Sequence, residues 1–548
     1  MSGDGLPMPG PGGAAQALPV MGGPAKAGLG RVRRPALTLR PAWLQAVPPL
    51  ATFAVMVWGI TGSSYWRDEA ASLSAAERPL GNLIRMLGHV DAVHGAYYVI
   101  IWAVVRIGGA GELATRLPSA LAMAVAAAAV TALGRRLVSP RAGLASGLVF
   151  AILPEVSWYG QEARSYAMVT ALAAVASYLL VRAMRAAGGA GEAAGGAGAG
   201  RWLAGYGAAL AALGVANLFG LLLIIPHALT VALAWRRAAP RAGSGDCRSA
   251  GGGADHGSAE GRAADRSSLA LGWLAAAAAA VLLVSPLMAL AWVQRGQLAW
   301  LSPAGLAGLE SLQLLVGTTA MTIAAGAVLA CAVAFCVRRG RERRAAAWPR
   351  GLTGLAFPWL VLPPAILLAV SPVTPIYAFR YVMICTPAVA LLLGTGLAAL
   401  GRAAGALAFV LIAALGLPLQ LSIRSPGGHG DAILQADRIV AANMRPGDAV
   451  LEFKEENFAQ AYPFGIHDLD NVAQARTRIA SATLIGTFLP DPVVRQRLAQ
   501  VSRVWVVEYG DRQPLPVLSG LRFRLVRAWQ TSDIWLFLYA AESGGTSQ

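Results

Sequence analysis

The sequence predicts a polytopic α-helical membrane protein that ends in a small α/β domain. Of its 548 residues, 56% are hydrophobic and only 13% are charged, and the mean hydropathy is +0.55. An ordinary soluble domain is less apolar and carries more charge. Residues 423–548 differ from the rest, because charged residues are frequent there and apolar residues alternate with polar ones, a pattern typical of strands.

The basic balance of the chain is explained by a membrane and not by nucleic acid. The net charge is +17, which in a soluble protein would suggest a nucleic-acid partner. Here the arginines cluster in short segments between apolar runs, as the positive-inside rule and contact with anionic lipid require. The four cysteines show neither a disulfide framework nor a metal-binding spacing. We therefore expect membrane lipid as a partner, and no nucleic acid.

A membrane-spanning helix needs about 20 apolar residues. Eleven stretches approach this length and are predicted to span the membrane: 43–62, 116–137, 142–158, 165–184, 202–218, 220–236, 269–292, 317–337, 354–371, 382–400 and 404–422.

Residues 93–109 are apolar but short, and Arg106 interrupts them. If they spanned the membrane, the basic clusters at 135–141, 182–185 and 236–237 would all face outward, against the positive-inside rule. We therefore expect an amphipathic or re-entrant helix that lies at the interface. This choice brings the stretches SSYWRDEAASL (63–73), SWYGQEARSYA (157–167) and PIYAFRY (375–381) to one outer face.

The same topology divides the chain into three parts. Residues 1–41 are expected to form a disordered basic N-terminus in the cytoplasm, and residues 42–422 a transmembrane catalytic domain with flexible cytoplasmic loops at 186–200 and 238–268. Residues 423–548 are expected to form an extracytoplasmic α/β domain. In that domain the pattern predicts a helix over 431–444, with Asp431 as its N-cap, and strands at 448–453, 502–509 and 533–540.

The chemistry-bearing residues gather near predicted span ends. Asp68 and Glu69 follow the first span, and a predicted surface helix over 71–90 follows them. A carboxylate held at such a corner can act as a general base, although charges at a span end are also common without function. Arg164 and Arg380 open two later spans and could hold a lipid phosphate through paired hydrogen bonds; alternatively, Arg164 is a snorkelling or locally paired side chain.

A base and cations at one membrane face suit sugar transfer from a polyprenyl-phosphate sugar, since the developing negative charge on the leaving phosphate needs cations nearby. A transporter or flippase for a lipid-linked sugar could use the same basic groove without a base. A scaffold that displays the C-terminal domain is a third interpretation. Ionisable residues at mid-membrane would favour transport, and this sequence keeps nearly all of them at span ends.

Several motifs in order resemble the GT-C glycosyltransferases, in the branch of the protein O-mannosyltransferases and the lipid A aminoarabinose transferase. The resemblance covers about residues 43–400. It is carried by the Asp68–Glu69 pair, His94 with Tyr97 and Tyr98, ELATRLPSALA (112–122), LGRRLVSPRAGLAS (133–146), LPEVSWYGQEARSYAM (153–168) and FRYVMICTPAVALLLG (379–394). One departure is Val93–Ala96, where many relatives read His–Pro–Pro–Leu.

The resemblance implies a multi-pass enzyme of the bacterial plasma membrane that transfers a sugar with inversion. Mannose is the first guess, and the acceptor is a glycolipid, a cell-wall glycan or a protein. Asp68 would be the base, Glu69 would position the acceptor or a cation, and Arg164 and Arg380 would hold the donor phosphate. Residues expected to contact substrate are Arg67, Asp91, His94, Tyr97, Tyr98, Gln161, Glu162 and Tyr381. No cofactor is required, but Asp68 and Glu69, with Asp91 and Glu162, could bind a divalent cation.

Overall fold

The computed structural model describes residues 42–187, 197–237, 255–342, 349–452, 458–510 and 516–542. The predicted disordered segment 1–41 lies outside these residues, as do most of the two predicted cytoplasmic loops. The described residues from Trp43 onward belong to one compact unit. The division at residue 422 into two domains stays a prediction.

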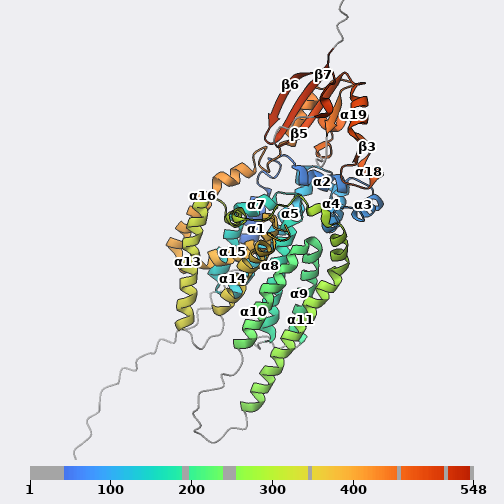
Figure 1. Cartoon of the computed structure of the whole chain (residues 1–548). Coiled ribbons are helices and arrows are strands. Elements are labelled where there is room, and N and C mark those ends of the chain that lie inside the picture. The colour runs from blue at the N-terminus through green and yellow to red at the C-terminus, as the bar shows by residue number, and fades with distance from the viewer. Residues whose placement is uncertain are drawn as a thin grey trace, which may run out of the picture. The chain divides into compact units, whose positions relative to one another are not determined.

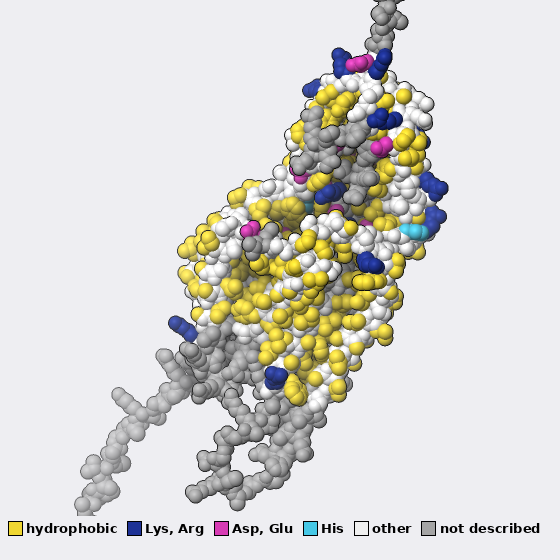
Figure 2. Space-filling view, in the orientation of Figure 1, with side chains coloured by type: hydrophobic (Ala, Val, Ile, Leu, Met, Phe, Trp, Pro, Cys, Tyr) yellow, Lys and Arg dark blue, Asp and Glu magenta, His cyan; other side chains and the backbone are white. Residues whose placement is uncertain are grey.

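All eleven predicted spans are helical, and seven helices of the described part are long and apolar enough to cross a membrane. These are α5 (Glu112–Leu137), α8 (Tyr166–Ala187), η3 with α10 (Leu218–Arg236), Ser267–Val293 of α11, Leu352–Val370 of α14 (Pro349–Val370), η6 with α15 (Phe379–Ala399) and α16 (Arg402–Ile423). The chain is therefore a multi-pass membrane protein, and its outer surface over these helices is largely hydrophobic (Figure 2).

Four predicted spans differ from a straight long helix. Two are bent pairs: α6 (Pro140–Ile152) with α7 (Pro154–Gly160) at 62°, and Gly308–Leu315 with the start of α13 (Thr319–Glu342) at 72°. Helix α9 (Ala197–Ala216) is long but rich in Gly and Ala. Helix α1 (Val47–Val57) ends early, because a turn follows it in which Gly59 has a φ of +64°. The exact number of spans thus stays a prediction.

Small residues allow the central helices to pack closely. Figure 1 shows α8 beside α5 and α9, and α11 beside α9. A Cβ atom on Gly143 of α6 would clash with the Thr131 carbonyl of α5, and one on Gly394 of α15 would clash with the Ser146 backbone of α6. Membrane helices commonly use such residues where backbones cross.

The segment between α1 and α5 forms short helices: α2 (Arg67–Ala76), α3 (Leu80–Leu87), η2 (Ala92–His94) and α4 (Gly95–Gly108). The single surface helix predicted over 71–90 is wrong, because Pro79 separates α2 from α3. Helix α2 begins earlier than predicted, so Asp68 and Glu69 occupy its first turn, where the helix dipole favours carboxylates. At 14 residues, α4 is shorter than a span, as predicted.

The C-terminal part contains the small α/β fold predicted from sequence. Its five-stranded sheet has the order β2-β1-β5-β7-β6, with β1 parallel to β2 and β5, and with β7 antiparallel to β5 and β6. The strands are β1 (Ala449–Glu452), β2 (Asp470–Asn471), β5 (Arg503–Tyr509), β6 (Phe523–Thr531) and β7 (Ile534–Ala541), and β3 (Gln474–Arg476) pairs separately with β4 (Thr487–Phe488). Figure 1 shows α19 (Asp491–Leu498) beside this sheet.

Strands β1, β5 and β7 match the prediction, whereas β2, β3, β4 and β6 were missed. The predicted helix over 431–444 is present as α17 (Ile433–Asn443). The prediction that Asp431 caps it is wrong, because Ala432 occupies the cap position without a side-chain hydrogen bond. Asp431 Oδ2 instead accepts a hydrogen bond of 2.8 Å from the backbone N–H of Arg67, at the start of α2.

The α/β part is bonded directly to α2 through buried arginine contacts. Arg78, only 1% exposed, donates to the carbonyls of Ser74 and Thr483, each at 2.8 Å. Arg478, in the α/β part, donates to the Ser74 carbonyl at 2.7 Å and to Glu77 at 3.0 Å. The short helix that carries Asp68 is therefore fixed by residues four hundred positions later in the chain.

This contact predicts that Arg78→Ala destabilises the attachment of the α/β part. The substitution leaves the Thr483 carbonyl without its donor, which costs about 1–3 kcal/mol. We expect a lower Tm in detergent and faster protease release of a C-terminal fragment. Arg85→Ala is the matched control, because Arg85 reaches the Ile479 carbonyl only through an exposed hydrogen bond. Equal Tm values for the two variants would contradict this account.

Candidate functional site

The structure brings together three predicted site residues that are far apart in sequence. Asp68 Oδ2 lies 2.6 Å from Arg380 Nη1 and 3.8 Å from Arg164 Nη2. They come from the first turn of α2, from the start of η6 (Phe379–Cys385), and from the segment that separates α7 from α8. The Asp68 side chain is 25% exposed, so a substrate can reach it.

Hydrogen bonds to the end of α1 and to α5 hold the segment 161–165 in place. Gln161 donates to the carbonyls of Met56 and Trp58 at 2.7 and 2.8 Å. Its side chain thus ties the segment to the end of α1, and this placement does not offer the substrate contact that was predicted for Gln161. The Glu162 carbonyl accepts from the Ser119 hydroxyl at 2.7 Å, which anchors the segment to α5.

A hydrogen-bonded chain behind Arg164 orients its guanidinium. Arg164 donates to His94 Nε2 at 3.1 Å and to the Tyr98 hydroxyl at 3.4 Å. The Tyr98 hydroxyl in turn donates to Asp91 Oδ2 at 2.7 Å. Asp91, His94 and Tyr98 were all predicted as site residues. The structure places them around Arg164, where they position the cation that faces Asp68.

Charge and burial set the protonation of this cluster. Burial alone would raise the pKa of Asp68, but Arg164 and then Arg380 outweigh it and hold that pKa below its ordinary value. Burial raises the pKa of Asp91 despite the nearby Arg164. Burial, with Arg164 adding to it, lowers the pKa of His94 well below its ordinary value. The His94 ring is therefore neutral at pH 7 and can accept the hydrogen bond from Arg164.

Glu69 does not share the surroundings of Asp68. Its two oxygens accept from Arg116 Nε and Nη2 at 2.8 and 2.7 Å, and both side chains are fully buried. Glu69 Oε1 also accepts from the Ala163 N–H at 2.7 Å. The predicted contact of Glu69 with an acceptor or a cation does not fit this placement. The residue instead joins α2, α5 and the segment 161–165.

Two other predicted substrate contacts lie against other aromatic rings, and a third is buried. The Arg67 guanidinium lies 4.2 Å from the centre of the Tyr509 ring in β5. Tyr381 stacks on Phe219 with ring centres 4.5 Å apart. Tyr97 is only 2% exposed and packs in the cluster beneath α3 and α4.

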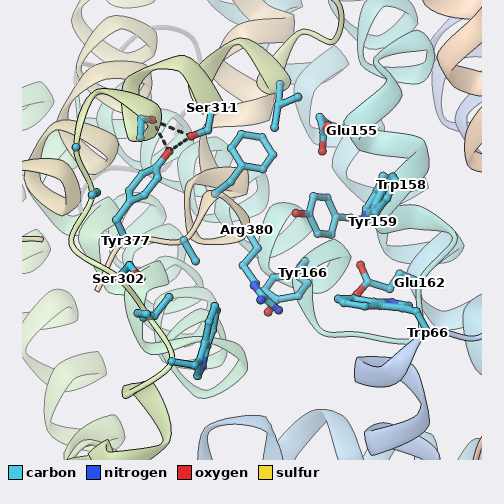
Figure 3. Close-up of a pocket in the computed structure, with 18 of the residues that line it drawn as sticks. Trp66, Glu155, Trp158, Tyr159, Glu162, Tyr166, Ser302, Ser311, Tyr377 and Arg380 are labelled. Carbon is cyan, nitrogen blue, oxygen red and sulfur yellow. Dashed lines mark hydrogen bonds between the residues drawn. The ribbon is translucent and has the colours of Figure 1, made fainter. Parts of the chain in front are cut away.

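A cavity of about 780 Å³ opens beside Arg380. Figure 3 shows Glu155, Glu162 and Arg380 among its lining residues, with Trp66, Trp158, Tyr159 and Tyr166 forming aromatic walls. On the opposite side, the Tyr377 hydroxyl donates to the Gly308 carbonyl at 3.0 Å and contacts the Ser311 hydroxyl at 2.6 Å (Figure 3). The lining thus combines aromatic and aliphatic residues with Arg380 and a few carboxyl and hydroxyl groups.

Sequence reasoning missed Glu155, Trp300 and Tyr377 as lining residues. Glu155 precedes Glu162 by seven residues, or about two helical turns. That spacing was available as a signal, although the break after α7 makes it unreliable. Trp300 lies in a segment between helices, and only the fold brings it to Arg380, whose guanidinium lies 5.1 Å from its ring centre.

The described residues contain no group of three or more His, Cys, Asp or Glu side chains that could hold a metal ion. Asp68 and Glu69, the expected ligands of a cation, are each paired with arginine.

Residues 96–239 match the family model described as dolichyl-phosphate-mannose-protein mannosyltransferase. No curated protein matches the sequence. The fold is similar to that of ArnT from Cupriavidus metallidurans in the apo state, at 14% identity and a TM-score of 0.54, over 90% of this chain and 97% of that chain. The same ArnT bound to undecaprenyl phosphate is matched at 13% identity and a TM-score of 0.51, with the same coverage.

An archaeal oligosaccharyltransferase, AglB from Archaeoglobus fulgidus, in complex with an inhibitory peptide and a dolichol-phosphate, is also similar. Its identity is 11% and its TM-score is 0.46, over 84% of this chain and 69% of that chain. The match to the family model is thus limited to residues 96–239, and the similarity to ArnT is one of fold.

Proposed function

We propose that this protein is an inverting glycosyltransferase that moves a sugar from a polyprenyl-phosphate donor to an extracytoplasmic acceptor. The observation that carries this proposal is the contact of one reachable carboxylate, Asp68, with Arg380 and Arg164 beside an aromatic cavity. The lipid-phosphate sugar in the family description and the undecaprenyl phosphate bound to ArnT support a donor of this class.

Mannose is the first sugar to test, because it is the sugar in the family description. The acceptor is a hydroxyl of a glycolipid, a cell-wall glycan or a protein. By the positive-inside rule, the arginine-rich segments between the predicted spans belong on the cytoplasmic side. This orientation supports an N-terminus in the cytoplasm, and an active site and an α/β part outside the cell.

The transfer requires one base and cations for the leaving group. The acceptor oxygen attacks the anomeric carbon as the bond from that carbon to the phosphate oxygen breaks, and the electron pair leaves with the phosphate. Asp68 takes the proton of the acceptor hydroxyl. Arg164 and Arg380 stabilise the negative charge that develops on the phosphate. Attack opposite the leaving group inverts the configuration.

The resting ion pairs imply that donor binding activates the base. With both arginines turned to it, Asp68 has a lowered pKa and is a weak base. A donor phosphate offers competing oxygens that suit bidentate bonds from arginine. Once Arg380 turns toward the phosphate, its positive charge no longer offsets the effect of burial on Asp68. The pKa of Asp68 therefore rises. The carboxylate then becomes a better base when the donor is in place.

Asp68→Asn should abolish sugar transfer and keep donor binding. The amide preserves the size of the side chain but cannot take a proton, so turnover should fall by about 100-fold or more. The assay uses purified protein, radiolabelled polyprenyl-phosphate sugars and a membrane extract as acceptor. Glu77→Gln is the matched control, because it makes the same change at the end of the same helix, away from the cavity. It should keep wild-type turnover.

One result would contradict the assignment of Asp68 as the base, and another would contradict the whole proposal. Wild-type turnover in Asp68→Asn would make Asp68 a charge without catalytic function. A wild type that moves the lipid between leaflets but transfers no sugar would replace the enzyme with a transporter.

The pH dependence of activity should show whether the donor phosphate draws Arg380 away from Asp68. Activity requires ionised Asp68, so it falls as the pH drops through the pKa of this group. The profile of kcat/KM reports the free enzyme, where that pKa is lowered, so its acidic limb should lie below the ordinary pKa of an aspartate. The profile of kcat reports the donor complex, and its acidic limb should lie at higher pH. Coincident limbs would show that the donor leaves the ion pairs of Asp68 unchanged.

A further inference from the structure

Glu162 is a buried acid without a hydrogen-bond partner in the part of the chain that the structure describes. Its side chain is fully buried, and neither carboxyl oxygen finds a donor or acceptor there. Burying an unpartnered polar group is unfavourable. Figure 3 shows Glu162 and Trp66 among the residues that line the cavity. A ligand in the cavity would supply the missing partner.

Hydrogen bonds fix the segment around Glu162. Gln161 is bonded to the end of α1, the Ala163 N–H to Glu69, and Arg164 to His94 and Tyr98. The backbone carbonyl of Glu162 is bonded to Ser119. Within residues 161–165, Glu162 is the residue that lines the cavity.

The cavity around Glu162 has the character of a sugar site. Trp66, Trp158 and Tyr166 present flat aromatic faces, on which the C–H groups of a sugar ring can pack. The indole nitrogen of Trp66 is also buried without a partner among the described residues. A few buried polar atoms between aromatic walls fix the orientation of a polar ligand. A polyprenyl tail would leave these atoms unpartnered.

Arg380 connects this cavity to the candidate catalytic carboxylate. It lines the cavity and bonds to Asp68 at 2.6 Å. A donor whose phosphate lies at Arg380 can therefore extend its sugar toward Glu162. This orientation rests on the proposed function, since it takes the phosphate at Arg380 as given.

We propose that Glu162 binds the sugar of the donor through hydrogen bonds to its polar substituents, and that this contact is separate from phosphate binding by Arg380. Burial, and next the nearby Glu69, raise the pKa of Glu162 well above its ordinary value. The raised pKa favours the protonated carboxyl, which can both donate to and accept from a hydroxyl.

The test compares binding of two lipids to the full-length protein in nanodiscs: polyprenyl-phosphate mannose and bare polyprenyl phosphate. Glu162→Leu should weaken binding of the sugar-bearing lipid by about tenfold or more, and that of bare polyprenyl phosphate by less than about twofold. Arg380→Ala should weaken binding of both lipids. Glu162→Gln keeps one donor and one acceptor group and should restore most of the affinity.

Stability provides a second readout that a structural role would not give. Because Glu162 has no partner in the free protein, Glu162→Leu should leave the Tm unchanged or raise it. A lowered Tm with unchanged preference for the sugar-bearing lipid would make Glu162 a structural residue and overturn the inference. Equal binding of the sugar-bearing lipid by wild type and Glu162→Leu would also overturn it.

Two further outcomes are distinguishable. If Glu162→Gln fails to restore affinity, and an amino-sugar lipid binds the wild type better than the mannose lipid, Glu162 binds the sugar as an anion through an ammonium group. That result supports the sugar contact. If the wild type binds neither the sugar-bearing lipids nor bare polyprenyl phosphate, the proposed function fails, and this inference fails with it.

Discussion

The buried ion pair between Glu69 and Arg116 is the interaction on which the rest of the site depends. It joins α2 to α5 through two short hydrogen bonds, and Glu69 also holds the Ala163 N–H. Successive residues of an α-helix point about 100° apart, so a Glu69 fixed inward turns Asp68 toward the arginines. Loss of one partner would leave a buried charge, at a cost of about 3–5 kcal/mol. Of two adjacent acids, one therefore orients the helix and leaves the other available for chemistry.

The α/β part acts on the same helix from its other side. Asp431 accepts from the first amide of α2, and Arg78 and Arg478 bond to the carbonyl of Ser74 near its end. Helix α2 has only ten residues, and so short a helix is marginal without tertiary contacts. The α/β part thus stabilises the helix that carries Asp68.

Polar groups near the site differ in whether the protein gives them hydrogen-bond partners. Arg164 donates to Tyr98 and His94, and both arginines pair with Asp68. Buried atoms without a partner among the described residues include the Glu162 carboxyl and the Trp66 indole nitrogen, and also Arg164 Nε and the Ser165 hydroxyl. Natural proteins tolerate such unfavourable groups chiefly at functional sites. Glu162 and Trp66 line the cavity, so they are the ones that a ligand there could satisfy.

The sequence alone determined the helical membrane class, the shortness of helix α4 and the α/β fold at the end, because hydropathy, period and charge are local properties of a chain. It also pointed to Asp68, Arg164 and Arg380. Only the family resemblance separated Asp68 from Glu69, since the local pattern cannot show which side of a helix each of two adjacent residues faces. That side was decided by Arg116, 47 positions away. Likewise, Asp431 suggested a local helix cap, but its partner Arg67 lies 364 positions earlier. Glu155 and Trp300 became cavity residues only when separate helices packed together, because tertiary packing alone brings such distant side chains to one wall.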